Sequence, residues 1–204
     1  MHIYGIEDGT ELVKAARHSI ELYLTMRHFD NGIVKKSASH FTEQYGIFVT
    51  LENYQTGALR GCIGFPRGGS PIGESVVEAA IAAAFEDPRF VPVSRVELED
   101  LLISVSILSK PVQIKGAAKV RMKAIKVGRD GLIAEYGHYS GLLLPIVAVE
   151  QKWDEEQFLE ETCRKAGLPA NYWSQPNVTL LRFETQLFKE ETPGGKVAEV
   201  EYSK

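Results

Sequence analysis

The chain has 204 residues, of which 44% are hydrophobic and 25% charged, and its formal net charge is −4 at pH 7. These values are typical of a soluble globular protein, and the net acidity gives no general attraction to nucleic acid or to an anionic membrane. The start lacks the basic flank and apolar run of a signal peptide, and the longest apolar stretches, 79–85 and 142–149, are too short to span a bilayer. We therefore expect a cytoplasmic protein of one domain over residues 1–204, with two lobes that share an interface as the alternative.

The N-terminal part of the sequence predicts a helix followed by a β-hairpin. Asp8 and Glu11 resemble a capping box ahead of apolar residues at helical spacing, which predicts a first helix that ends near Arg27. The runs 47–51 and 58–63 flank a glycine-containing loop, which is typical of a hairpin.

Two further helices have clear start signals. Ser70 is a natural N-cap and Pro71 suits the first helical position, so a buried second helix should follow them. Asp154 with Gln157 predicts the start of a third helix, and Gly167 predicts its end.

The remaining segments predict mostly antiparallel strands. Residues 103–107 alternate strictly, which predicts a strand with one wet or polar-lined face, and 126–133 reads as a second hairpin. The apolar run 142–149 contains a proline and is expected to be an edge or irregular strand, whereas 178–188 should form a long strand. The charged tail, 190–204, is expected to be loosely ordered. Mixed helices and hairpins favour an α+β fold with antiparallel sheets.

The segment 59–71, LRGCIGFPRGGSP, places Cys62 among four glycines and two arginines. In an extended strand Arg60 and Cys62 project from the same face about 6–7 Å apart, so the guanidinium would favour the thiolate. Gly61 and Gly64 keep the neighbouring backbone accessible. We therefore expect a lowered thiol pKa and a reactive or ligand-contacting cysteine; the alternative is a small buried side chain in a tight strand.

The glycine-rich loop after this strand is a candidate anion site. Arg67, Gly68, Gly69 and Ser70 could cradle a phosphate or carboxylate on their amides, although the P-loop pattern is absent. The alternative is a flexible loop that carries an ordinary helix cap.

Two more residues could act with the thiol. Asp87 follows the second helix, where the helix dipole does not favour an aspartate, so we expect an arginine partner, with Arg60, Arg89 or neither left open. An ion pair of this kind could be structural or could supply a catalytic acid. His138 lies in a glycine-flanked turn and is the most plausible base for Cys62, although a turn histidine can equally be plain surface.

The sequence predicts no metal site and no cofactor. Two cysteines without a CxxC motif cannot form a cysteine-rich zinc site, and the other four histidines lack HxxxH spacing. Both thiols should be free in a reducing compartment, and Cys163 lies on the apolar stripe of its helix, where packing explains it.

The hexapeptide LRGCIG, residues 59–64, resembles the signature of the AMMECR family, and blocks at 82–90, 103–108, 141–145 and 163–168 resemble that family's blocks in the same order. The resemblance implies an α+β fold in which antiparallel sheets and flanking helices form two unequal lobes with a cleft near LRGCIG. No reaction is firmly assigned to the family; relatives occur fused to or beside Memo-like and radical SAM proteins, which implies a modification pathway. Many relatives have glutamine where this chain has Ile146, so a glutamine role does not carry over.

These observations favour a module that binds an anionic small molecule or a partner, because a nucleophile needs a base within reach and none is evident. The alternative is a thiol-dependent enzyme in which Cys62 is the nucleophile or redox thiol and His138 or Asp87 assists proton transfer. Nucleic acid contact is disfavoured, since no basic stripe with interleaved aromatics is visible. The expected ligand contacts are Arg60, Gly61, Gly64, Arg67, Gly68, Gly69, Ser70, Asp87 and Arg89.

Overall fold

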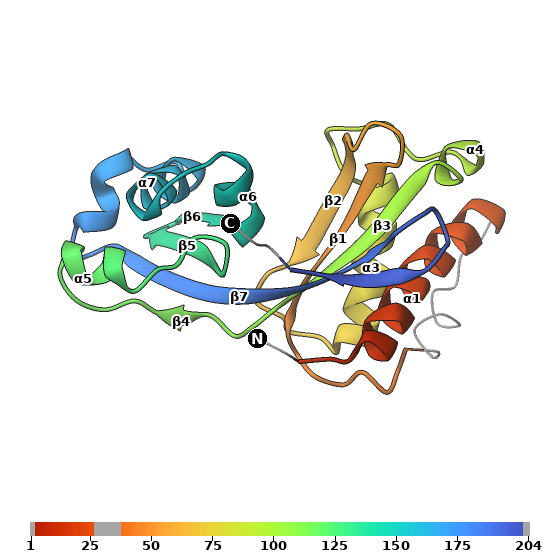
Figure 1. Ribbon diagram of the computed structural model, residues 1–204, viewed down its shortest axis with the longest axis horizontal. Helices are drawn as coiled ribbons and strands as arrows, with labels where there is room; N and C mark the ends of the chain where they lie inside the picture. Colours follow the sequence, from red (N-terminus) through yellow and green to blue (C-terminus); the bar gives the residue numbers. More distant parts are fainter. Residues whose placement is uncertain (1–2, 27–37, 202–204) are drawn as a thin grey trace. The chain divides into compact units, whose positions relative to one another are not determined.

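The computed structural model describes residues 3–26 and 38–201 and confirms the α+β class, with antiparallel strands and packed helices (Figure 1). The chain forms two compact units of unequal size. The larger contains the described residues up to Leu108 together with Gln186–Val200, and the smaller contains Ser109–Thr185. Among the described residues, no helix is long and apolar enough to cross a membrane.

The sheet of the larger unit has the strand order β2-β1-β3-β7-β8, and the pairs β1–β2, β1–β3 and β7–β8 are antiparallel. Its elements are α1 (Ile6–Thr25), β1 (Gly46–Asn53), β2 (Leu59–Phe65), α3 (Ile72–Phe85), α4 (Arg95–Leu98), β3 (Leu101–Leu108), the end of β7 (Thr179–Glu190) and β8 (Val197–Val200). The predicted hairpin is therefore confirmed as β1 and β2. Strand β2 lies at the outer edge of this sheet.

Helices α1 and α3 pack together and cover one face of this sheet (Figure 1). Alternate residues of β1 and β3 point into the core beneath them and are fully buried: Ile47, Val49, Leu51, Ile103, Val105 and Ile107. Gly61 lets α3 approach β2, because a Cβ there would lie 2.2 Å from the carbonyl oxygen of Ala83. The period-2 pattern of the sequence is thus explained by burial against two helices.

The first two predicted helices, α1 and α3, begin at residues other than those predicted. Helix α1 starts at Ile6, and Asp8 lies inside its first turn, where its carboxylate accepts a hydrogen bond from the Gly5 N–H at 3.1 Å. Its expected end near Arg27 lies outside the described residues. Helix α3 follows Pro71 and has no side-chain cap, so Ser70 is not the N-cap that its residue type predicted.

The smaller unit packs helices on a sheet of order β4-β7-β5-β6, which includes the start of β7. Its other elements are β4 (Val112–Gln113), α5 (Ala118–Lys123), β5 (Asp130–Tyr136), β6 (Tyr139–Leu143), α6 (Pro145–Glu150), α7 (Glu155–Lys165) and the 3-10 helix η1 (Ala170–Ser174). Helix α7 packs on β5 and β6. The capping box of Asp154 and Gln157 is confirmed, as is Gly167, whose φ of +77° lies in the left-handed region.

Three predictions for the later segments are wrong. Residues 126–133 are not a hairpin: they form a turn and the start of β5, whose hairpin partner is β6. The run 142–149 is not one irregular strand: β6 ends at Leu143, and Pro145 opens α6, where its missing N–H costs nothing because the first helical N–H has no intrahelical partner. The tail is not loose up to Val200, because β8 pairs with β7 from Leu187 to Glu190. A charged sequence therefore still forms a strand when a partner edge is present.

Candidate functional site

Cys62 lies in the middle of a polar row across the sheet of the larger unit. It is paired with Thr50 of β1, which is paired in turn with Ser104 of β3. Because Gly61 faces α3, Cys62 points to the opposite face. The Thr50 hydroxyl donates to the Cys62 sulfur at 3.3 Å. Ser104 is only 5% exposed, so the polar-lined face predicted for β3 is present but is buried rather than wet.

The electrostatics of the thiol differ from the prediction. Burial raises the pKa of Cys62 above its ordinary value, and the hydrogen bond from Thr50 and the positive charge of Arg89 offset only part of this. The expected lowering of the thiol pKa is therefore wrong. The sequence showed the neighbouring arginine but not the desolvation of the sulfur, which depends on tertiary packing.

Arg60 does not interact with the Cys62 thiol, although its position two residues away on the same strand had predicted that it would. Its Nε and Nη2 pair with the carboxylate of Glu97, and Nη2 also donates to the Val91 carbonyl at 2.7 Å. The third nitrogen, Nη1, is buried and has no hydrogen-bond partner among the described residues. The guanidinium lies 5.6 Å from the centre of the Phe90 ring.

The arginine partner predicted for Asp87 is Arg89. The Asp87 carboxylate, only 4% exposed, accepts from Arg89 Nε at 2.9 Å, from Nη2 at 2.6 Å and from the Arg89 amide at 3.1 Å. These hydrogen bonds from Arg89 hold the pKa of Asp87 well below its ordinary value. The Arg89 side chain itself is 52% exposed and lies 5.3 Å from the centre of the Phe90 ring.

Asp87 and Arg89 also bind the backbone of Cys62. The Cys62 N–H donates to Asp87 Oδ2 at 3.0 Å, and Arg89 Nη2 donates to the Cys62 carbonyl at 3.2 Å. The structure thus brings together four of the predicted site residues, Arg60, Cys62, Asp87 and Arg89, around Phe90. We call these five residues the Cys62 cluster.

The glycine-rich loop is a separate feature at the far end of β2, and its helix amides are already used. The first two amides of α3, at Ile72 and Gly73, donate to the carbonyls of Glu43 and Phe41 at 2.9 and 3.1 Å. These two amides are therefore not available to an anion, whereas the predicted cradle used the amides of residues 67–70. Gly68 and Gly69 have positive φ angles, so they give the loop its shape, and Arg67 and Ser70 are exposed. Ligand contact by these residues stays a prediction.

The predicted base His138 belongs to the smaller unit, where it is exposed in the turn between β5 and β6. Its pairing with Cys62 stays a prediction. Cys163 lies in the core of the smaller unit with no exposed surface, and burial raises its pKa to about 11. The packing role that the helical stripe predicted for Cys163 is therefore confirmed.

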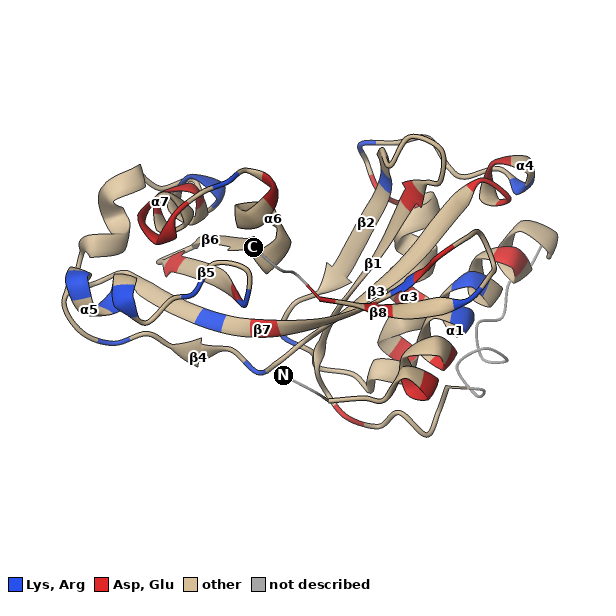
Figure 2. Cartoon of the chain, in the orientation of Figure 1, with Lys and Arg blue, Asp and Glu red and all other residues tan. Residues whose placement is uncertain are grey.

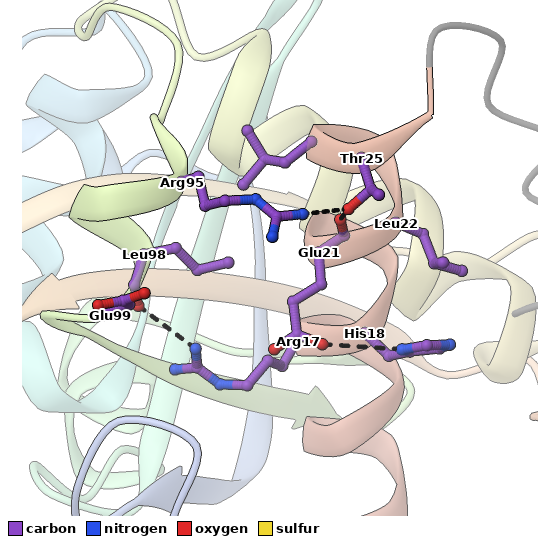
Figure 3. Close-up of a pocket in the computed structure, with 9 residues that line it drawn as sticks. Arg17, His18, Glu21, Leu22, Thr25, Arg95, Leu98 and Glu99 are labelled. Atoms are coloured by element: carbon purple, nitrogen blue, oxygen red, sulfur yellow. Dashed lines mark hydrogen bonds and ion pairs between the residues drawn. The ribbon is translucent and has the colours of Figure 1, made fainter.

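A hollow of about 380 Å³ that the sequence did not predict lies between α1 and α4 (Figure 3). Arg17, Arg95 and Leu98 are among its lining residues, and none of the Cys62 cluster is. Arg17 is tied to the buried Glu190 through Nε and Nη2, both at 2.6 Å, and to the Leu98 and Leu101 carbonyls. One sequence signal was available: Arg17 follows the buried Val13 by four residues, which puts a charge on the apolar side of α1.

Charges of both signs are dispersed over the helices of each unit (Figure 2). Helix α7, for example, begins with Glu155 and Glu156 and ends with Arg164 and Lys165, which suits its dipole. Within 3–26 and 38–201, no group of three or more His, Cys, Asp or Glu side chains could hold a metal ion.

The AMMECR1 family model matches residues 13–188. The chain belongs to the AMMECR1 family. The match includes β1, β2, α3, β3 and the loops between them, and therefore all of the Cys62 cluster.

Three relatives of this AMMECR1-family protein, all from archaea, are similar to it over nearly its whole length. A protein of Thermococcus gammatolerans is 48% identical, with 96% of this chain and 97% of the relative covered. Protein MJ0810 of Methanocaldococcus jannaschii is 45% identical, with 98% of each covered. The crystal structure of an uncharacterised protein, PH0010 of Pyrococcus horikoshii, matches with a TM-score of 0.88 at 45% identity, covering 96% of this chain and 97% of that one. These likenesses establish the family and the fold, and they carry no activity.

Proposed function

We propose that this protein binds an anionic small molecule, or an anionic group of a partner protein, at the Cys62 cluster. The observation that carries the proposal is the state of Arg89. Its guanidinium is half exposed, and the bonds to Asp87 and to the Cys62 carbonyl use only Nε and Nη2. Among the described residues, no hydrogen bond uses Nη1, so two fixed donors remain for a carboxylate or phosphate.

The binding would depend on fixed donors more than on net charge. Asp87 and Glu97 neutralise Arg89 and Arg60, so the cluster has no strong positive field. Asp87 instead fixes the Arg89 side chain, which lowers the conformational entropy that a ligand must remove. We therefore expect weak to moderate affinity that responds to ligand geometry.

The raised pKa of Cys62 disfavours the alternative of a thiol-dependent enzyme. At neutral pH the sulfur is protonated, and a thiol is a much weaker nucleophile than a thiolate. The hydroxyl of Thr50 donates a hydrogen bond to the sulfur and is not a base that could remove its proton. Binding of an anion requires neither a thiolate nor a base.

Thermal unfolding tests the proposal with inorganic phosphate, citrate and ATP at constant ionic strength. A ligand at ten times its dissociation constant should stabilise the wild type by about 1.4 kcal/mol. The variant Arg89→Ala should lose this stabilisation by the ligand. The matched control Arg129→Ala breaks a similar pair, Arg129 with Asp130, in the smaller unit and should keep it. If no probe stabilises the wild type, or if both variants respond alike, the proposal is wrong.

We also propose that the binding takes place in the cytoplasm and serves a partner of the class that the family resemblance implies, a Memo-like or radical SAM protein. Both cysteines are free, which suits a reducing compartment. Gel filtration of the protein mixed with a purified Memo-like or radical SAM protein tests the partner. Separate elution of the two proteins at about 100 μM each, a concentration at which a complex with a dissociation constant of about 1 μM would be formed, would contradict it.

A further inference from the structure

The outer edge of β2 has backbone groups that no strand of the described residues covers. Strand β2 is the last strand of the larger unit's sheet, with β1 on its inner side. In an antiparallel pair, residues alternate between those that bond the neighbouring strand and those whose N–H and C=O point away from it. Cys62 is of the second kind, because both its backbone groups bond the side chains of Asp87 and Arg89.

Asp87 and Arg89 therefore take the place of a neighbouring strand residue. Asp87 Oδ2 accepts from the Cys62 N–H at 3.0 Å, as a strand carbonyl would, and Arg89 Nη2 donates to the Cys62 C=O at 3.2 Å, as a strand N–H would. The two side chains hold each other through two further bonds, at 2.9 and 2.6 Å. We call this pair the edge clasp.

The sequence of β2 makes such a cover necessary. An exposed edge strand invites pairing with another chain unless charge, proline or a covering element prevents it. Strand β2 has no proline, and its single charged residue, Arg60, is tied to Glu97. Its ends carry exposed apolar side chains, with Leu59 43% and Phe65 37% exposed.

We infer that the edge clasp of Asp87 and Arg89 keeps β2 from pairing with β2 of a second copy of this chain. Antiparallel pairing of two identical strands is two-fold symmetric, so it forms a closed dimer. Centred on Cys62, it would exchange the two backbone bonds that the clasp now makes. The two Cys62 Cα atoms would then lie about 5.5 Å apart, within disulfide range. The inference does not depend on any ligand.

The experiment compares two double variants by light scattering after gel filtration. Asp87→Ala with Arg89→Ala removes the clasp. Arg129→Ala with Asp130→Ala is the matched control, because Asp130 is also buried (1% exposed), holds a backbone N–H and pairs with an exposed arginine, but β5 has a strand on both sides. The clasp variant should have twice the mass of the wild type, and the control should not.

Crosslinking identifies the surface that pairs. Diamide, a two-electron oxidant, converts two thiols into a disulfide while it is reduced to the hydrazine, and mass spectrometry should find a Cys62–Cys62 crosslink only in the clasp variant. Adding Leu59→Lys should return the mass to that of the wild type, since an exposed edge charge opposes pairing. The milder Arg89→Gln covers the case in which the double variant does not fold, and should shift mass and crosslinking in the same direction. Unchanged mass in the folded variants, or equal dimerisation of the control, would overturn the inference.

Discussion

Replacement of Asp87 tests how much the carboxylate contributes to the stability of the larger unit. It accepts three hydrogen bonds from Arg89 and one from the Cys62 amide. Because the Arg89 side chain is half exposed, water can solvate it when the carboxylate is removed, so the Asp87–Arg89 ion pair contributes about 1 kcal/mol or less to stability. The Cys62 N–H left without a partner costs about 1–3 kcal/mol. Asp87→Ala should therefore destabilise the protein by about 1–4 kcal/mol at pH 7.

The pH dependence separates the charge from the packing. Arg89 holds the native pKa of Asp87 below its unfolded value of about 3.9. A depressed carboxyl pKa stabilises the protein fully above the unfolded pKa, and this stability is lost as the pH falls below about 3.9 towards the native value. Asp87→Asn, which keeps an oxygen for the Cys62 amide, should thus differ from the wild type at pH 7 and approach it in acid.

Urea unfolding followed by far-UV circular dichroism is the assay, because both tryptophans, Trp153 and Trp173, lie in the smaller unit and would not report on Asp87. Glu86→Gln is the control, since Glu86 is the exposed neighbouring carboxylate and its replacement should change stability by less than about 0.5 kcal/mol. The reasoning is refuted if Asp87→Asn is as stable as the wild type at pH 7, or if their difference is the same at every pH.

Three further predictions concern single positions. The rate of Cys62 alkylation by iodoacetamide should rise with pH, with a midpoint above the ordinary thiol pKa of about 8.5. Thr50→Val should raise this midpoint further, because the Thr50 hydroxyl favours the thiolate. A midpoint at or below about 8.5 would contradict the burial of the sulfur. Gly61→Ala should lower the urea midpoint by the equivalent of about 2 kcal/mol or more, because the added Cβ meets the carbonyl oxygen of Ala83 at 2.2 Å, and an unchanged midpoint would show that α3 moves away freely. Asp154→Ala should destabilise the protein by about 1 kcal/mol in thermal unfolding, because it removes the N-cap of α7. If the loss comes from the cap, Asp154→Ser should restore the stability in full.

Local patterns in the sequence were enough for much of the secondary structure. The capping box at Asp154 and the glycine at Gly167 act within a few residues of the helix end, so the chain determines them wherever the helix lies. The alternation in β3 and the apolar stripe around Cys163 also predicted the structure correctly, because an element buried on one face has apolar residues at a regular spacing in the sequence. The hexapeptide 59–64 also directed attention to the residues that gather around Cys62.

The tertiary structure alone decided what that site can do. Arg60 pairs with Glu97, 37 residues away, and not with the thiol two residues along its own strand. The amides at the start of α3 are taken by carbonyls of an earlier loop, and the sulfur of Cys62 is desolvated by packing. Hydrogen-bond partners and desolvation depend on which distant segments meet, so a local sequence pattern can indicate where a charge or thiol lies but not whether it is free, paired or ionised.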